Sequence, residues 1–225
     1  MAGVDIPPPV EAEAPETARP LARILSLPLV DTVRLALEHS NNLVTELIGQ
    51  VAARRLAGKA LPLAQSGPAL GRWLTGRMPG VSWKGFLLTN HSGLTSRARV
   101  SPMQMAAIVR FASHQRYGGW TFPSLLPASG VRDSMRGRFR DPVTALRLWA
   151  KTGTLKYAKG LAGVLFTPSG RRVAFALYVT DFERRRQYDA EVDPQAPETA
   201  QRAEDWIRRA EALEEDLVRE WVMGF

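Results

Sequence analysis

Two short motifs contain the residues whose types and spacing could do chemistry. Ser40-x-Asn42 lies between two predicted helices, and Lys151-Thr152-Gly153 lies at the end of a predicted strand. Their hydroxyl, amide and amine groups are of the kind that serve hydrogen bonding and proton transfer. Either triplet alone is a weak signal, because three-residue motifs recur by chance. The first also fits a simple helix cap, and the second a solvated lysine at a strand end.

The signatures of most other catalytic classes are absent. The chain has no cysteine, which excludes a thiol nucleophile, a disulfide scaffold and cysteine-ligated metal. Neither G-x-S-x-G, G-x-x-x-x-G-K, G-x-G-x-x-G nor H-E-x-x-H occurs. His39, His91 and His114 form no H-x-x-x-H pair, so we expect no metal site and no cofactor. Adjacent residues such as His91 and Ser92 seldom orient as a catalytic pair.

Five segments, in chain order, carry a resemblance to a known family. They are SLPLVDTVRLALEHSNNLVTELIG, Asn90–Thr95, Val100-Ser101-Pro102, Ser124–Pro127 and Lys151–Leu155. Together they resemble the D-alanyl-D-alanine carboxypeptidases of the class C penicillin-binding proteins, in register over roughly residues 20–182. The resemblance implies serine-type carboxypeptidase or endopeptidase action on peptidoglycan peptides, with acylation by β-lactams as side chemistry.

The resemblance also assigns roles to individual residues. Ser40 relays a proton, and Lys151 supplies the charge that holds Ser40 and attracts the terminal carboxylate of the substrate. Four residues bind substrate: Asn42 hydrogen-bonds its amide, Thr152 offers a hydroxyl to its carboxylate, Gly153 lets it lie close, and the backbone N–H of Thr154 is an oxyanion donor. Lys156 and Lys159, just past the motif, do not fit the family pattern, so we expect their substitution to cost far less.

Three departures from the family pattern stand out. None of the serines is followed three residues later by lysine, so the Ser-x-x-Lys nucleophile motif of the family is missing. We therefore expect a C-terminal portion that is inactive alone, with a missing N-terminal half as a candidate partner. Asn90 and His91 replace Asp and Gly, and a histidine is poorly suited to a positive φ angle. Asp133-Ser134-Met135 replaces Gly-Thr-Leu.

Hydrophobic spacing predicts the elements that must position these motifs. One helix starts near Ser26, and a second follows the break at residues 40–42, with Asn42 as its N-cap. Residues 58–102 are predicted to be mostly loop with a short strand at 83–88, and Ser101-Pro102 opens another helix. Strands are predicted at 145–151, 161–167 and 173–180, the last two forming a hairpin. A long helix covers about 198–222.

These elements give an α+β chain. The fold implied by the resemblance is a partial penicillin-binding transpeptidase (β-lactamase-like) fold, with an antiparallel sheet, flanking helices and a long C-terminal helix. Residues 1–20 are rich in proline and acids and are predicted to be a flexible lead-in. Residues 21–225 are predicted to form the C-terminal portion of the catalytic domain.

Charge divides the chain into three parts. Residues 47–180 carry 20 basic and 2 acidic side chains, whereas both ends are acidic on balance. Such a field attracts anions, which leaves two alternatives to the enzyme: a basic nucleic-acid-binding protein, or a non-catalytic module that binds D-Ala peptides or a partner. No nucleic-acid motif accompanies the charge.

We expect neither a transmembrane segment nor a signal peptide in this chain, although the family is periplasmic or extracytoplasmic.

Overall fold

The structure is a computed structural model that describes residues 22–131, 135–190 and 196–225, together with the isolated residues 8, 11, 13 and 19. The predicted lead-in over residues 1–20 therefore lies almost wholly outside the described residues. Two residues of the predicted departure at 133–135 also lie outside them. Within the described ranges, no helix is long and apolar enough to cross a membrane.

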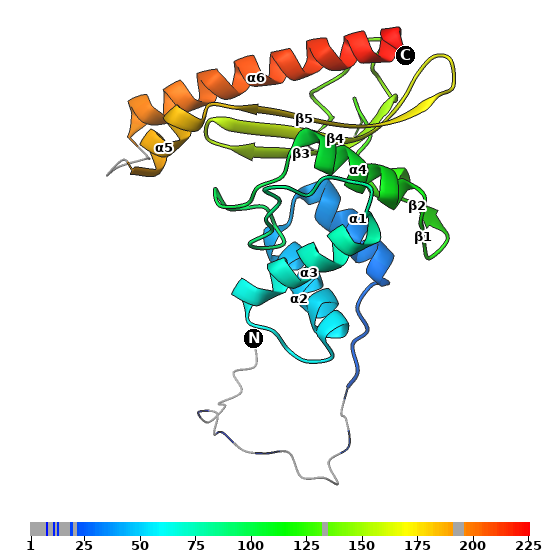
Figure 1. Cartoon of the computed structure of the whole chain (residues 1–225), viewed down its shortest axis with the longest axis vertical. Helices are drawn as coiled ribbons and strands as arrows, with labels where there is room; N and C mark the ends of the chain where they lie inside the picture. The colour runs from blue at the N-terminus through cyan, green and yellow to red at the C-terminus, as the bar shows by residue number, and fades with distance from the viewer. Residues whose placement is uncertain are drawn as a thin grey trace, which may run out of the picture.

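A three-stranded antiparallel sheet organises one half of the molecule. It comprises β3 (Leu148–Leu155), β4 (Ala158–Phe166) and β5 (Arg172–Thr180), in the order β3-β4-β5. Helix α6 (Pro197–Gly224) crosses one face of this sheet, and α4 (Pro102–Ser113) packs on the other face (Figure 1). The predicted α+β class, with a long C-terminal helix, is confirmed.

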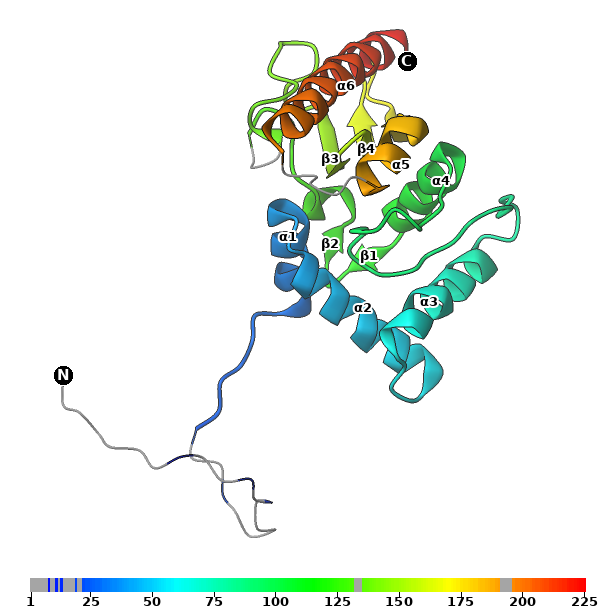
Figure 2. The same cartoon turned by 90° about the vertical axis from the view of Figure 1, so that its left-hand side faces the viewer.

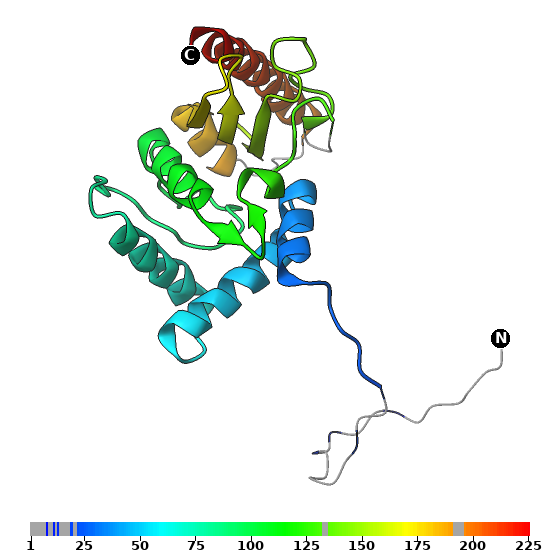
Figure 3. The ribbon, with the colours of Figure 1, turned by 90° about the vertical axis from the view of Figure 1, so that its right-hand side faces the viewer.

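The other half is helical. It contains α1 (Leu29–His39), α2 (Asn42–Ala57) and α3 (Leu63–Arg77), of which α2 and α3 pack side by side. A small hairpin of β1 (Arg116–Tyr117) and β2 (Trp120–Thr121) and the 3-10 helix η1 (Pro123–Leu125) lie between α4 and β3 in the chain, and η1 contacts β3. Helix α1 contacts η1, so the end of α1 lies next to the sheet (Figures 2 and 3).

The core lies between the sheet and α6. Strand side chains alternate between two faces, and on the α6 face Leu148 pairs with Leu165 across β3 and β4. Helix α6 contributes Val218 and Val222, both fully buried. The buried cluster comprises Met135, Phe139, Leu148, Ala150, Leu161, Leu165, Phe175, Val218 and Val222. This core holds β3, the strand that carries the Lys151-Thr152-Gly153 motif, by packing on the face of the sheet that is covered by α6.

All three predicted strands are present, with shifted ends. Strand β3 begins at Leu148 because Leu146 adopts a left-handed conformation with φ 57°, which interrupts an extended chain. It then continues to Leu155, so the Lys151-Thr152-Gly153 motif lies inside the strand and not at its end. Strand β4 starts at Ala158, because Leu155 and Ala158 pair across a two-residue turn.

The prediction for residues 58–102 was wrong in two places. Residues 63–77 form helix α3, whose Gly67 and Gly71 lie against the backbone and side chains of residues 86–90. These glycines allow close packing and do not mark a loop. The predicted strand at 83–88 reduces to a single bridge between Leu87 and Arg99.

The helix predicted to open at Ser101-Pro102 is confirmed as α4. The Ser101 side chain accepts a hydrogen bond from the Gln104 backbone N–H, and the Gln104 side chain accepts one from the Ser101 N–H. This reciprocal capping satisfies two backbone donors that the first helical turn leaves free.

Candidate functional site

The structure brings the two predicted motifs together. The Lys151 ammonium donates a hydrogen bond to the Ser40 hydroxyl, across 111 positions of sequence. It donates a second hydrogen bond to the backbone oxygen of Thr152, at 2.6 Å. A serine and a lysine in direct contact can exchange a proton, which is the chemistry expected of this pair.

Ser40 is held at the junction of α1 and α2. Its backbone is left-handed, with φ 52° and ψ 43°, and its N–H bonds the carbonyl of Ala36, which ends α1. A non-glycine residue pays roughly 1–2 kcal/mol for this conformation. The turn points the exposed Ser40 side chain toward β3, so the strained residue is the one that meets Lys151.

The prediction that Asn42 caps α2 was wrong, because its neighbour does so. The Asn41 side chain accepts a hydrogen bond from the Val44 backbone N–H at 3.0 Å. Asn42 is the first residue of the helix, and it is exposed one position beyond the cap. Because Asn41 makes the cap, the Asn42 amide is available to a ligand next to Ser40.

The environment of Lys151 destabilises its charged form. Burial lowers the pKa of the Lys151 ammonium below its ordinary value, and the positive charge of Lys159 lowers it further. The two groups that accept hydrogen bonds from Lys151, the Ser40 hydroxyl and the Thr152 carbonyl, are both neutral. A lysine with a lowered pKa releases its proton more readily, which suits a proton relay.

Among the described residues, no strand pairs with the edge of β3 that lies beside this pair, so this edge is open. The segment at residues 127–129 covers the start of the edge, where Ala150 N–H bonds the Pro127 carbonyl and Ser129 N–H bonds the Leu148 carbonyl. These bonds show that alternate residues of β3 direct their backbone groups outward. By that alternation the N–H groups of Thr152 and Thr154 face the uncovered part of the edge.

Gly153 lies on this open part of β3. It is exposed, and a Cβ added there would come no closer than 4.0 Å to another part of the protein, the Gly160 carbonyl. Internal packing therefore does not require a glycine at this position. An extended ligand that pairs with the strand edge would benefit from the missing side chain.

The loop at Asn90–Thr95 is braced by Glu46 of α2. The Glu46 carboxylate accepts hydrogen bonds from the N–H groups of His91 and Ser92 and from the Ser92 hydroxyl, at 2.7–3.3 Å. Burial alone would raise the pKa of Glu46, but these hydrogen bonds outweigh it and lower the pKa. The loop is thus tied to the helix that starts beside Ser40.

The expectation that His91 disturbs this loop was wrong. The positive φ of the loop falls on Gly93, at 78°, and not on His91. The His91 ring packs on Gly49 of α2, and its Nε2 lies 2.8 Å from the Ser66 hydroxyl. Burial lowers the pKa of His91, so the neutral ring is favoured, although Glu46 opposes this in part. Ser66 is fully buried, which leaves this contact a structural one.

Lys159 is a residue of the site region that sequence reasoning set aside. Its ammonium lies 2.8 Å from the Thr154 hydroxyl and 2.6 Å from a carboxylate oxygen of Glu211 on α6. Thr154 and Lys159 are direct partners across β3 and β4. A two-residue turn at Lys156-Tyr157 places Thr154 opposite Lys159. The strands predicted from the sequence ended at residue 151 and began again at 161, so this pairing was not predicted.

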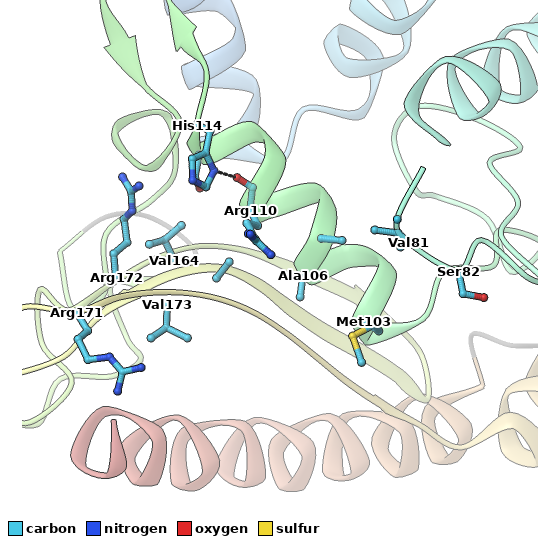
Figure 4. Close-up of a pocket in the computed structure, with 14 residues that line it drawn as sticks. Val81, Ser82, Met103, Ala106, Arg110, His114, Val164, Arg171, Arg172 and Val173 are labelled. Atoms are coloured by element: carbon cyan, nitrogen blue, oxygen red, sulfur yellow. Dashed lines mark hydrogen bonds between the residues drawn. The ribbon is translucent and has the colours of Figure 1, made fainter. Parts of the chain in front are cut away.

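In the described part of the chain, cavities lie on either side of the sheet region. The larger, about 630 Å³, lies between α4, residues 80–82 and the β4–β5 hairpin, and it contains Arg110, Arg171 and Arg172 but neither motif (Figure 4). The smaller, about 450 Å³, is lined by α1, η1 and Trp149, two residues before Lys151. Among the described residues, no cluster of histidine and carboxylate side chains could hold a metal ion.

Comparison with known proteins connects this geometry to a family. The model of the D-Ala-D-Ala carboxypeptidase 3 (S13) family matches residues 2–199. Carboxypeptidase DacB of Mycolicibacterium smegmatis is 31% identical over 163 residues, which are 70% of this chain and 35% of that protein. D-alanyl-D-alanine carboxypeptidase DacB of Haemophilus influenzae is 23% identical over 76% of this chain and 35% of its own length.

Solved structures show the fold. Penicillin-binding protein 4 of Haemophilus influenzae, in complex with a β-lactam, matches with a TM-score of 0.64 and 23% identity, over 75% of this chain and 39% of its own. A predatory endopeptidase of Bdellovibrio bacteriovorus matches with a TM-score of 0.51 and 19% identity, over 79% of this chain and 42% of its own. The penicillin-binding fold class predicted from the sequence is confirmed. The chain spans about a third of the length of the curated relatives it matches, and it belongs to the D-Ala-D-Ala carboxypeptidase 3 (S13) family.

Proposed function

We propose that this chain forms the Ser40–Lys151 side of a serine-type D-Ala-D-Ala peptidase site for peptidoglycan peptides, which β-lactams also occupy. The observation that carries the proposal is the hydrogen bond from Lys151 to Ser40 beside the open edge of β3. Family membership and the β-lactam complex of a protein with the same fold support it. Because peptidoglycan lies outside the cytoplasmic membrane, we infer an extracytoplasmic place of action.

In the proposed binding mode, a peptide ending in D-Ala-D-Ala lies extended along the edge of β3. Pairing with a strand edge supplies main-chain hydrogen bonds, here from the N–H groups of Thr152 and Thr154. The Lys151 ammonium and the Thr152 hydroxyl bind the terminal carboxylate, and the Asn42 amide binds a backbone amide of the peptide. The missing side chain at Gly153 leaves room for this approach.

The proposed reaction is acyl transfer. A serine gives its hydroxyl proton to the lysine of its own Ser-x-x-Lys motif and attacks the carbonyl carbon of the penultimate D-alanine, and the N–H of Thr154 stabilises the resulting oxyanion. Ser40, held by Lys151, then relays that proton to the amine of the departing D-alanine as the C–N bond breaks. The attacking serine of the Ser-x-x-Lys motif does not occur in this sequence. We therefore propose that the chain alone binds ligand without forming an acyl-enzyme, so that fluorescent penicillin leaves no covalently labelled band at 24.9 kDa.

The second candidate is a non-catalytic module that recognises D-Ala-terminated peptides or completes a partner. The missing Ser-x-x-Lys motif is the observation that favours it, because recognition needs only the β3 edge and the Ser40–Lys151 pair. The two candidates share their binding residues and differ in whether the chain acts together with a nucleophile.

Ligand titration of the ¹⁵N-labelled chain by NMR tests the shared part of the proposal. We expect an acetylated peptide ending in D-Ala-D-Ala to shift the amide signals of residues 40–42 and 151–155. The matched peptide ending in L-Ala-L-Ala should shift them far less. Equal shifts with both peptides, or shifts confined to other parts of the chain, would contradict the proposal. Binding of a polyanion that weakens steeply with salt, without any response to D-Ala-D-Ala, would instead favour a nucleic-acid-binding protein.

A further inference from the structure

A second lysine lies on the opposite face of the sheet from Lys151. Lys159 of β4 is directly across from Thr154, and only 5% of its side chain is exposed. Its ammonium is held by two groups, the Thr154 hydroxyl at 2.8 Å and the Glu211 carboxylate at 2.6 Å. A buried ammonium is costly unless it is paired and hydrogen-bonded, so Lys159 is confined to this position.

We propose that Lys159 is a positioning residue of the Ser40–Lys151 site, and that it acts through the sheet from the α6 face. Side chains alternate along β3, so Lys151 and Thr154, three residues apart, point to opposite faces. Lys151 meets Ser40 on one face, and Thr154 meets Lys159 and α6 on the other. The segment of β3 that would bind substrate is therefore in contact with other elements on both faces of the sheet: with Ser40 on one face and with Lys159 on the other.

The first action of Lys159 is electrostatic. Next to burial, its positive charge is the cause that lowers the pKa of Lys151. Among the described residues, the acids that face Lys159 belong to α6: Glu211, in direct contact, and Glu214, which is fully buried. Arg138 lies on the same side and pairs with Glu214 at 2.9 Å. Glu211 is thus paired with Lys159, and Glu214 with Arg138. The positive charge of Lys159 acts across the sheet on the pKa of Lys151.

On the other face, the groups that hold the Lys151 ammonium among the described residues are neutral. The contacts of its ammonium are the hydroxyl of Ser40 and the carbonyl of Thr152, both neutral. From α1, His39 precedes Ser40, and Glu38 pairs with Arg34 at 3.0 Å. Lys159 is a charged residue whose field acts on Lys151, so it is placed to tune how readily Lys151 exchanges its proton with Ser40.

The second action of Lys159 is mechanical. The turn between β3 and β4 is already fixed at its tip, where the Tyr157 ring packs edge-on against Trp206 of α6 and Tyr188 of the short helix α5 (Phe182–Ala190). Arg185 of α5 also donates a hydrogen bond to the Lys156 carbonyl at 3.0 Å. The link from Thr154 through Lys159 to α6 adds a polar anchor beside these rings. It holds the strand at the residue whose N–H is the proposed oxyanion donor.

Lysine titration by NMR separates this role from a merely structural one. The chain contains only five lysines, so selective ¹³C labelling gives five resolvable side-chain signals, assigned by single Lys→Arg variants. We expect the pKa of Lys151 in the intact chain to lie below the ordinary value of a lysine and to rise in Lys159→Met. Lys159→Arg, which keeps the charge, should leave it low. Lys156→Met serves as the matched control and should not change it, because that lysine is more exposed and lies 4.0 Å from its acidic partner.

An unchanged Lys151 pKa in a folded Lys159→Met chain would overturn the proposal. If Lys159→Met does not fold by circular dichroism, Lys159→Gln supplies the same test, since an amide can still bridge Thr154 and Glu211 without a charge. The role of Lys159 in a substrate site rests on the proposed function, but the experiments test the two independently. A pKa change without D-Ala-D-Ala binding refutes only the function, and binding without a pKa change refutes only the role of Lys159.

Discussion

Gly49 and His91 fit together so closely that a Cβ on residue 49 would lie 2.0 Å from Cγ of the imidazole ring. The ring occupies the space that a side chain on α2 would otherwise fill. This contact secures the Asn90–Thr95 loop to the helix that begins beside Ser40, and it explains how the family's loop accommodates a histidine.

Gly49→Ala should therefore destabilise the chain, although alanine is the better helix former. We expect a loss of about 1–3 kcal/mol in the free energy of unfolding, because the methyl group displaces the ring. Gly76→Ala in α3 is the matched control, since a Cβ there meets nothing within 4 Å. That change should be neutral or stabilising by up to about 1 kcal/mol. Urea denaturation of both variants measures the difference, and equal effects would show that the Gly49–His91 contact is unimportant.

The hydrogen bonds to Glu46 predict a pH dependence of stability. Because the folded-state pKa of Glu46 is lowered from its ordinary value of 4.5, its carboxylate stabilises the fold at neutral pH. That contribution is lost as pH falls through the ordinary range and then through the lowered folded-state pKa. The stability difference between wild type and Glu46→Gln should thus be largest near neutral pH and shrink in acid. Glu220→Gln, at an exposed position on α6, should show no such trend; a gap for Glu46→Gln that widens in acid would contradict the account.

Arg138 and Arg219 allow a test of how burial changes the contribution of an ion pair to stability. Arg138 pairs with the fully buried Glu214 at 2.9 Å, whereas Arg219 is half exposed and lies 3.4 Å from Asp141. Arg138→Met leaves a carboxylate buried without its main partner, so we expect a loss of about 3–5 kcal/mol. Arg219→Met should cost less than about 1 kcal/mol. Thermal and urea unfolding of both variants provide the comparison, and similar losses would argue against a buried pair at Glu214.

The sequence predicted the elements whose signals are local. The apolar spacing in α1 and α6, the helix start at Ser101-Pro102 and the β4–β5 hairpin each depend on neighbouring residues, and all were confirmed. Two helices were missed for opposite reasons. Helix α3 contains Gly67 and Pro68, which resemble loop signals, while α5 is so polar that it has no apolar face and is held against the β3–β4 turn by Arg185.

The candidate site required non-local information. Nothing in local spacing brings Ser40 to Lys151; the family resemblance supplied that pairing, and the structure shows the contact. Which asparagine caps α2 depends on the left-handed turn at Ser40, which no propensity predicts. Lys159 was set aside because its register opposite Thr154 is fixed by the turn length and by Glu211, 52 residues away.

The most direct test of the central claim is the affinity of the chain for an acetylated D-Ala-D-Ala peptide, measured by calorimetry for wild type, Lys151→Ala and Lys156→Ala. Lys151→Ala removes a charge-assisted hydrogen bond to the terminal carboxylate, worth about 1.5–3 kcal/mol, so we predict a loss of roughly 10- to 100-fold in affinity. Lys156→Ala, at the β3–β4 turn, should bind as wild type does. A near-neutral Lys151→Ala, or an equal loss in Lys156→Ala, would contradict the assignment of the site.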